Sequence, residues 1–140
     1  MSTMSTSKVL LGLCDEGLPM SREALDRNLG GGDVHDVGRA YANLSSVLGS
    51  IASLARFGSP SYDISKAAQN MATALLAKAL AGDGVIVLAL HPGWARTDMG
   101  GENVTVPVAD SVAGLLQVID RATQDDRGHF FDWRGQPLPW

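Results

Sequence analysis

The chain is organised around the stretch Ser59-Pro60-Ser61-Tyr62-Asp63-Ile64-Ser65-Lys66-Ala67-Ala68. Tyr62 and Lys66 are four residues apart, and on a helix this spacing places both side chains on one face, one turn apart. An ammonium close to a phenol favours the ionised phenol, so such a pair can exchange a proton near neutral pH. The same spacing also fits a plain surface pair. The stretch therefore predicts a helix and, as a hypothesis, a general acid–base pair.

Two further blocks give this pair its context. Upstream, hydroxyl side chains gather in the segment Asn43-Leu44-Ser45-Ser46-Val47-Leu48-Gly49. Downstream, the run Val85-Ile86-Val87-Leu88-Ala89-Leu90 is apolar without alternation, which is typical of a parallel strand buried on both faces. The segment His91-Pro92-Gly93-Trp94 breaks that strand at its carboxyl end, where open α/β sheets bind ligands. Three blocks in this order are much more specific than any one of them.

The remaining chain predicts alternating strands and helices. Strands are expected at 8–14, 39–44, 85–90 and 129–133, and a short helix at 20–29. The central helix should begin at Ser59-Pro60 and run to about residue 81, because proline suits the first helical position. Residues 47–61 are expected to be a loop and residues 134–140 a tail. A further helix, capped by Asp110, should bury the apolar residues Val112, Leu115, Leu116 and Ile119. This order indicates an α/β fold with parallel strands.

Length and composition narrow the functional classes. The 140 residues fit one domain, and 45% hydrophobic with 19% charged residues is typical of a globular chain. A net charge of −4 with 11 Lys and Arg argues against a nucleic-acid partner. The apolar runs are too short to span a membrane. Cys14 is the single cysteine, which suits the reducing cytoplasm, and the three histidines show no metal-ligand spacing.

Together, these blocks resemble the second half of a short-chain dehydrogenase/reductase. Residues 43–50 are similar to the segment with the family's catalytic serine, and residues 62–70 to its Tyr-x-x-x-Lys helix. Residues 91–99 resemble the loop that closes over the nicotinamide. Residues 130–140 resemble the end of the C-factor or sniffer-like carbonyl reductase branch. The resemblance implies a partial Rossmann-type, doubly wound parallel sheet over roughly residues 40–140.

It also implies catalytic roles at the matching positions. Ser46, rather than Ser45, would hydrogen-bond the substrate carbonyl. Tyr62 would give its proton to the carbonyl oxygen as hydride arrives at the carbon, or take it in the reverse direction. Lys66 would hold the nicotinamide ribose and assist Tyr62. The implied reaction is an NADP- or NAD-dependent conversion of a small carbonyl or alcohol substrate.

Further positions are implied to bind the cofactor and the substrate. Pro92, Gly93 and Thr97 would contact the cofactor beside Tyr62 and Lys66. Trp94 would shape the substrate pocket or simply pack the loop. The helix from Tyr62 to Ala81 is apolar nearly all round, so one side should pack on the sheet and the other against a partner subunit, giving a homodimer or larger oligomer.

The chain also departs from the family pattern. The family's first half carries a Gly-x-x-x-Gly-x-Gly phosphate turn and an Asn-Ala-Gly strand end, and neither is found here. Gly30-Gly31-Gly32 follows a predicted helix rather than a strand, and Asn28 lies too close to Ser46 for the family's catalytic asparagine. Residues 1–38 are therefore interpreted as a divergent or truncated segment, apparently without the nucleotide-binding βαβ units, and residues 39–140 as the C-terminal half. Two functions stay open: an oxidoreductase, or a non-catalytic remnant that pairs with a full-length relative.

Overall fold

The computed structural model describes residues 9–11, 40–94 and 106–140. Its centre is a sheet in the order β1-β2-β3-β4-β5. The strands are β1 Val9–Leu11, β2 Ala40–Leu44, β3 Ile86–His91, β4 Phe130–Asp132 and β5 Pro137–Leu138. Strands β1 to β4 are parallel, and β5 is antiparallel to β4. The predicted parallel α/β sheet is confirmed.

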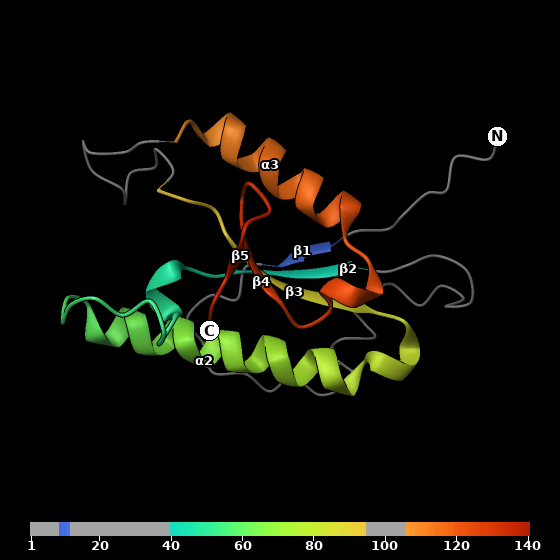
Figure 1. Cartoon of the computed structure of the whole chain (residues 1–140), viewed down its shortest axis with the longest axis horizontal. Helices are drawn as coiled ribbons and strands as arrows, with labels where there is room; N and C mark the ends of the chain where they lie inside the picture. Colours follow the sequence, from blue (N-terminus) through green and yellow to red (C-terminus); the bar gives the residue numbers. More distant parts are fainter. Residues whose placement is uncertain (1–8, 12–39, 95–105) are drawn as a thin grey trace.

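Two helices cover opposite faces of this sheet. Helix α2, Pro60–Ala79, lies on one face and α3, Val108–Arg121, lies on the other (Figure 1). Short 3-10 turns connect the elements: η1 Val47–Gly49, η2 Ala81–Asp83 and η3 Gln124–Asp126. Helix α2 begins with Pro60 at its first turn, as the sequence predicts. The order β2-α2-β3-α3-β4, with one helix on each face, makes this a partial doubly wound sheet.

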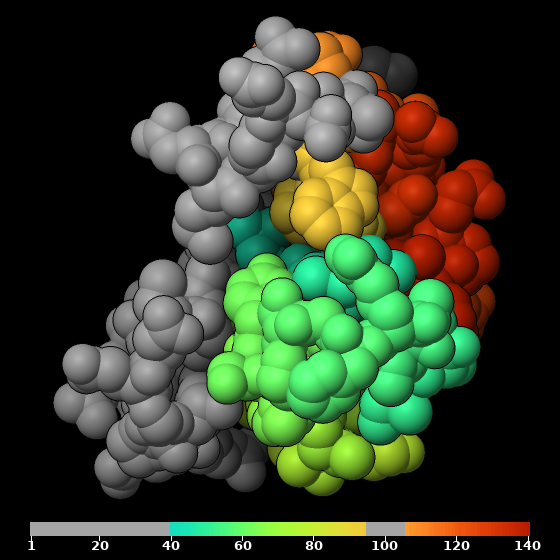
Figure 2. Space-filling view, turned by 90° about the vertical axis from the view of Figure 1, so that its left-hand side faces the viewer, coloured from blue at the N-terminus to red at the C-terminus, as the bar shows by residue number. Residues whose placement is uncertain are grey.

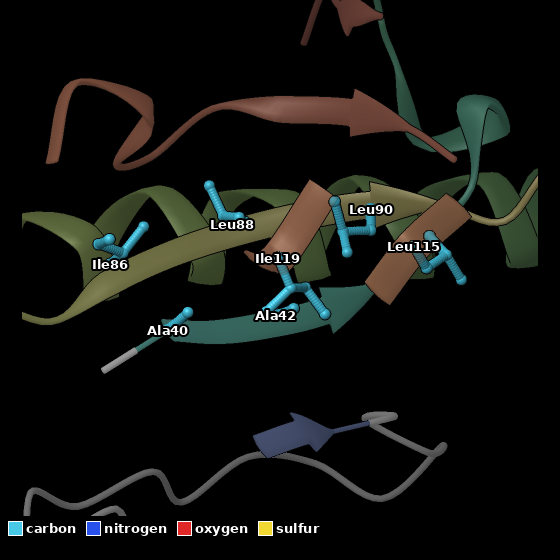
Figure 3. Packing of buried hydrophobic residues seen from close by; sticks show 7 residues of the cluster. All are labelled: Ala40, Ala42, Ile86, Leu88, Leu90, Leu115 and Ile119. Atoms are coloured by element: carbon cyan, nitrogen blue, oxygen red, sulfur yellow. The ribbon is translucent and has the colours of Figure 1, made fainter. Parts of the chain in front are cut away.

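The core follows the two-residue period of the strands. Alternate residues of β2 and β3 face α3 and pack against Leu115 and Ile119 of that helix (Figure 3). These strand residues are Ala40, Ala42, Ile86, Leu88 and Leu90. The intervening residues Tyr41 and Val87 pack with Ala77 and Leu80 on the α2 side. Strand β3 is thus buried on both faces, as its unbroken apolar run predicts.

Helix α2 buries polar residues against the sheet. Gln69, Asn70 and Thr73 are the buried positions of its middle turns, whereas Met71 and Leu75 are 62% and 60% exposed. Most of these buried polar groups are hydrogen-bonded: the Asn43 amide nitrogen donates to Thr73 Oγ1 (2.8 Å), and Thr73 Oγ1 donates to the Gln69 carbonyl (3.0 Å). Asn43 Oδ1 has no hydrogen-bond partner among the described residues. The hydrogen bonds that do form offset the cost of burying polar groups. One side of the helix therefore packs on the sheet as expected, through polar contacts in its middle turns and apolar contacts at its C-terminal end.

The prediction for α3 is wrong in two respects. The helix begins at Val108, after Pro107, so Asp110 lies in its first turn rather than at the cap. Of the four apolar residues expected in the core, Leu115 and Ile119 are buried, but Val112 and Leu116 are 48% and 51% exposed. Leu115 and Ile119 are the two that pack against residues of β2 and β3, and the helix is turned so that the other two lie at the side of this contact.

The expected tail is also wrong, because residues 134–140 return along the sheet edge. The Asp132 carboxylate accepts bonds from the Arg134 and Gln136 amides, and Gly135 adopts a positive φ of 81°. This turn brings β5 antiparallel to β4, and Trp140 then stacks on Phe130 with ring centroids 5.4 Å apart. The expected loop at 47–61 contains η1 at its start and the first residues of α2 at its end, and residues 51–59 between them are irregular and exposed.

Several expectations fall on residues outside the described ranges, including the helix at 20–29 and the roles of Cys14, Asn28 and Thr97. None of the helices in the described ranges is long and apolar enough to cross a bilayer. Within the same ranges, no group of three or more His, Cys, Asp or Glu side chains is arranged to hold a metal ion.

Candidate active site

The serine segment and the His91 loop meet at one edge of the sheet. Because β2 and β3 are parallel, their carboxyl ends lie side by side, with Leu44 paired to Leu90. The Ser45 amide extends the ladder by one bond to the Leu90 carbonyl (2.7 Å). Figure 2 looks onto this edge: the turn after β2 and the start of α2, in green, adjoin the residues that end and follow β3, in gold. This is where a doubly wound sheet binds ligands.

The serine segment is docked on the Tyr62–Lys66 turn of α2. Gly49, at the end of η1, lies so close to the helix that a Cβ built on it would be 2.7 Å from the Lys66 carbonyl carbon and 2.9 Å from the Ala67 nitrogen. A side chain at this position would collide with the helix backbone. The absence of a side chain at Gly49 therefore allows the turn that follows Ser46 to contact the helix directly.

Tyr62 and Lys66 lie one turn apart on α2, as their spacing predicts. The Lys66 ammonium is 5.5 Å from the centroid of the Tyr62 ring. The Tyr62 side chain is 40% exposed, and its hydroxyl has no hydrogen-bond partner among the described residues. The phenol is therefore open to a ligand at the edge of the sheet, with a cation beside it.

Two buried polar residues that the sequence analysis did not select tie this turn to β2. The Lys66 ammonium donates to Gln69 Oε1 (3.1 Å), and the Gln69 amide donates to the Leu44 carbonyl (2.8 Å). The Asn70 amide donates to the Gly49 carbonyl (3.3 Å). A signal was available, since Gln69, Asn70 and Thr73 share a face at helical spacing in an otherwise Ala- and Leu-rich helix.

The two adjacent serines have different environments. The Ser45 hydroxyl donates to Asn70 Oδ1 (2.5 Å), and both side chains are buried, so Ser45 belongs to the packing between β2 and α2. Ser46 caps η1, where its Oγ accepts the Leu48 amide (3.2 Å). Its hydroxyl proton remains available, because a hydroxyl can accept and donate at once.

The loop after β3 is held from the α3 side. The Ser111 hydroxyl donates to the Pro92 carbonyl (2.6 Å), and the Val106 amide donates to the Trp94 carbonyl (3.2 Å). Gly93 has a φ of 77°, a conformation that L side chains rarely adopt. The Trp94 side chain is 53% exposed. Pro92, Gly93 and Trp94 thus reach the edge that carries Ser46 and Tyr62.

His91 ends β3 opposite Asp132 of β4. Burial lowers the pKa of the His91 imidazole, and the nearby Asp132 carboxylate opposes that change by favouring the charged form. The Nδ1 atom of His91 is buried and has no hydrogen-bond partner in the part of the chain that the structure describes. The net lowering of the His91 pKa favours the neutral imidazole at the end of β3, directly before the Pro92–Trp94 loop.

No protein-family model matches the sequence. Among curated proteins, C-signal of Myxococcus xanthus is 43% identical over 102 residues, which is 73% of this chain and 61% of C-signal. A short-chain dehydrogenase of Neurospora crassa is 33% identical over 113 residues, covering 71% of this chain and 44% of that protein. The chain spans between 41% and 61% of the length of the curated relatives it matches.

Solved structures agree in fold and in sequence. The carbonyl reductase Sniffer of Drosophila melanogaster superimposes with a TM-score of 0.71 at 37% identity, covering 73% of this chain and 41% of Sniffer. The NADPH-bound carbonyl reductase from chicken fatty liver gives a TM-score of 0.68 at 39% identity, covering 73% of this chain and 43% of that enzyme. Shared sequence with the curated relatives and shared fold with the solved carbonyl reductases lead to one conclusion: the chain belongs to the short-chain dehydrogenase/reductase family.

Proposed function

We propose that the chain acts as an NADP- or NAD-dependent oxidoreductase, which transfers hydride between a nicotinamide and a small carbonyl or alcohol substrate. The observation that carries this proposal is the contact of Gly49 with Lys66. It docks the Ser46 turn on the helix that presents Tyr62, at the same edge as the loop after β3. A hydroxyl, a phenol and an ammonium at one sheet edge form a reasonable set for polarising and protonating a carbonyl oxygen.

Each side chain has the hydrogen-bonding capacity for its proposed role. The Ser46 hydroxyl accepts the Leu48 amide and still has its proton to donate to a substrate oxygen. Tyr62 acts as general acid or base, since its exposed hydroxyl has no partner among the described residues. Lys66 has three donors, and its one hydrogen bond among the described residues, to Gln69, leaves two for the ribose hydroxyls.

The cofactor supplies the hydride, and the chain's own residues fit its nicotinamide end. Pro92 and Gly93 lie in a loop fixed by Ser111, at the edge that carries Tyr62 and Lys66. Thr97 completes the proposed contacts and lies outside the described residues. Trp94, half exposed, would border the substrate. The NADPH-bound carbonyl reductase among the structural neighbours supports NADP over NAD.

The test is Tyr62→Phe, assayed by NADPH consumption with a panel of aldehydes and ketones. Only the hydroxyl is removed, so we expect an unchanged fold and a rate loss of about 10²–10⁴-fold. Ser65→Ala is the matched control, because the Ser65 hydroxyl lies on the exposed side of the helix and, among the described residues, bonds only the Tyr62 carbonyl. Equal activity of Tyr62→Phe and the parent chain would refute the proposed mechanism.

A second function rests on the exposed apolar side of α2. Ile64, Met71 and Leu75 are 68%, 62% and 60% exposed, which is unusual for three large apolar residues on one helix. They support pairing through α2, either as a homodimer or, for a non-catalytic chain, with a full-length relative. Leu75→Lys should weaken such an assembly in sedimentation, whereas Leu116→Lys on α3, where the leucine is 51% exposed, should not. Equal sedimentation of both variants and the parent would exclude α2 as the interface.

We also place the protein in the cytoplasm, a proposal supported by the single cysteine.

A further inference from the structure

Trp133, which follows β4, is in contact with two glycines from separate parts of the chain. A Cβ built on Gly93 would lie 2.8 Å from Nε1 and 2.9 Å from Cδ1 of the Trp133 indole. A Cβ built on Gly114 of α3 would collide with the Trp133 carbonyl oxygen and would lie 2.8 Å from Cε3. The pyrrole edge of the indole thus fills the space beside Gly93, and its benzene edge fills the space beside Gly114.

The remaining surroundings of Trp133 show what keeps the indole in place. The Arg134 guanidinium lies 4.8 Å from the centroid of the indole, a cation–π contact. Trp133 also forms a wall of an open groove of about 680 Å³ between α3 and the β4–β5 hairpin. Trp133 also packs against the core cluster that contains Leu115 and Ile119. The indole is therefore held by the core, by Arg134 and by its close contacts with the two glycines.

The loop that Trp133 touches is the one proposed to hold the nicotinamide. Gly93 has no side chain of its own to fix it, and its φ of 77° lies in a region that only glycine occupies readily. Ser111 Oγ holds the Pro92 carbonyl just before it, and Ser111 and Gly114 are three residues apart on α3. Helix α3 therefore contacts the loop directly through Ser111 and indirectly through Trp133.

We propose that Trp133 is a positioning residue, wedged between Gly93 and Gly114, that sets the position of the Pro92–Trp94 loop for cofactor binding. This inference deepens the proposed function and rests on it for the cofactor. Protein interiors are close-packed, so removing the indole leaves a void on the α3 side of Gly93. The loop then samples positions in which its contacts to the nicotinamide are lost.

The test compares Trp133→Leu with Trp140→Leu. The control removes another indole of the same hairpin, one that stacks on Phe130 instead of touching the loop. We expect Trp133→Leu to weaken NADPH binding at least about tenfold, whereas Trp140→Leu leaves it within about twofold. In spectra of the cofactor-free chain, the Gly93 and Trp94 amide signals should shift and broaden in Trp133→Leu alone, with the α2 signals unchanged. Trp133→Phe, which keeps an aromatic ring, should restore part of both properties.

Gly114→Ala and Trp133→Phe test the role of Trp133 even if Trp133→Leu fails to fold. Gly114→Ala adds one methyl group on α3, away from the loop, and should move the Gly93 signals by displacing Trp133. If Trp133→Leu does not fold, Trp133→Phe and Gly114→Ala carry the same test. Loop signals that change no more than in Trp140→Leu would overturn the inference. If no form of the chain binds NADPH, the proposed function fails, and the amide signals still decide the role of Trp133.

Discussion

Gly49 and Lys66 are in van der Waals contact at the centre of the site: a Cβ on Gly49 would lie 2.8 Å from the Lys66 Cβ. This contact connects two segments that the sequence analysis selected separately, the serine segment and the Tyr-x-x-x-Lys helix. Asn70 reinforces it by donating to the Gly49 carbonyl (3.3 Å). The position of Ser46 relative to Tyr62 therefore depends on how closely η1 approaches α2.

Gly49→Ala should separate these two segments. The added methyl group meets backbone atoms of Lys66 and Ala67, which cannot rotate away, so we expect a loss of about 1–3 kcal/mol in the free energy of unfolding. Gly82→Ala is the matched control, because nothing lies within 4 Å of a Cβ at that position. Urea unfolding measures both variants. A Gly49→Ala chain as stable as Gly82→Ala would contradict the close packing.

Ser45→Ala should mainly reduce the stability of the chain, whereas Ser46→Ala should mainly reduce its activity. Ser45→Ala leaves the buried Asn70 Oδ1 without its donor, and we expect a loss of about 1–3 kcal/mol in stability. Ser46→Ala removes the η1 cap at a cost of about 1 kcal/mol and, on the proposed mechanism, most of the carbonyl reduction. Unfolding and rate assays of both variants check this. If Ser45→Ala lost more activity than Ser46→Ala, Ser45 rather than Ser46 would be the serine that hydrogen-bonds the substrate carbonyl.

His91 should make the chain less stable at acidic pH. Burial lowers the pKa of His91 in the folded chain, whereas the unfolded chain protonates near its ordinary value of about 6.5. As the pH falls below about 6.5, the unfolded state therefore binds more protons and the free energy of unfolding decreases, until the folded imidazole is also protonated. His91→Gln should flatten this part of the stability–pH profile, and His129→Gln, at an exposed position, serves as the control. Equal slopes for all three chains would contradict this assignment.

The chain should bind NAD(P)H weakly. Its sequence carries the residues proposed for the nicotinamide end but no recognisable glycine turn for the pyrophosphate, and each 1.4 kcal/mol of lost contact weakens binding about tenfold. Calorimetric titration with NADPH and NADH measures this. Lys66→Ala should weaken any binding that is found, since its ammonium is the proposed ribose donor. Binding at micromolar concentration or tighter would show that the pyrophosphate is held by residues the sequence analysis did not identify.

The sequence by itself determined the local elements and the family. Ser59-Pro60 marks the start of α2, the apolar run at 85–90 marks the buried β3, and the spacing of Tyr62 and Lys66 places them one turn apart. These features depend on residues close together in the chain, so local pattern is sufficient to predict them. The parallel order of β2, β3 and β4 follows because helices separate the strands.

Only the tertiary structure decided which faces are buried and which distant residues meet. Helix α2 packs Gln69, Asn70 and Thr73 on the sheet because β2 and η1 supply partners for them, while Leu75 stays exposed. The contact of Gly49 with Lys66, and that of Trp133 with Gly93, joins residues 17 and 40 positions apart. The periodicity of a helix or strand shows which of its residues share a face, but not which other element that face packs against. These contacts are therefore fixed only when the layers pack together.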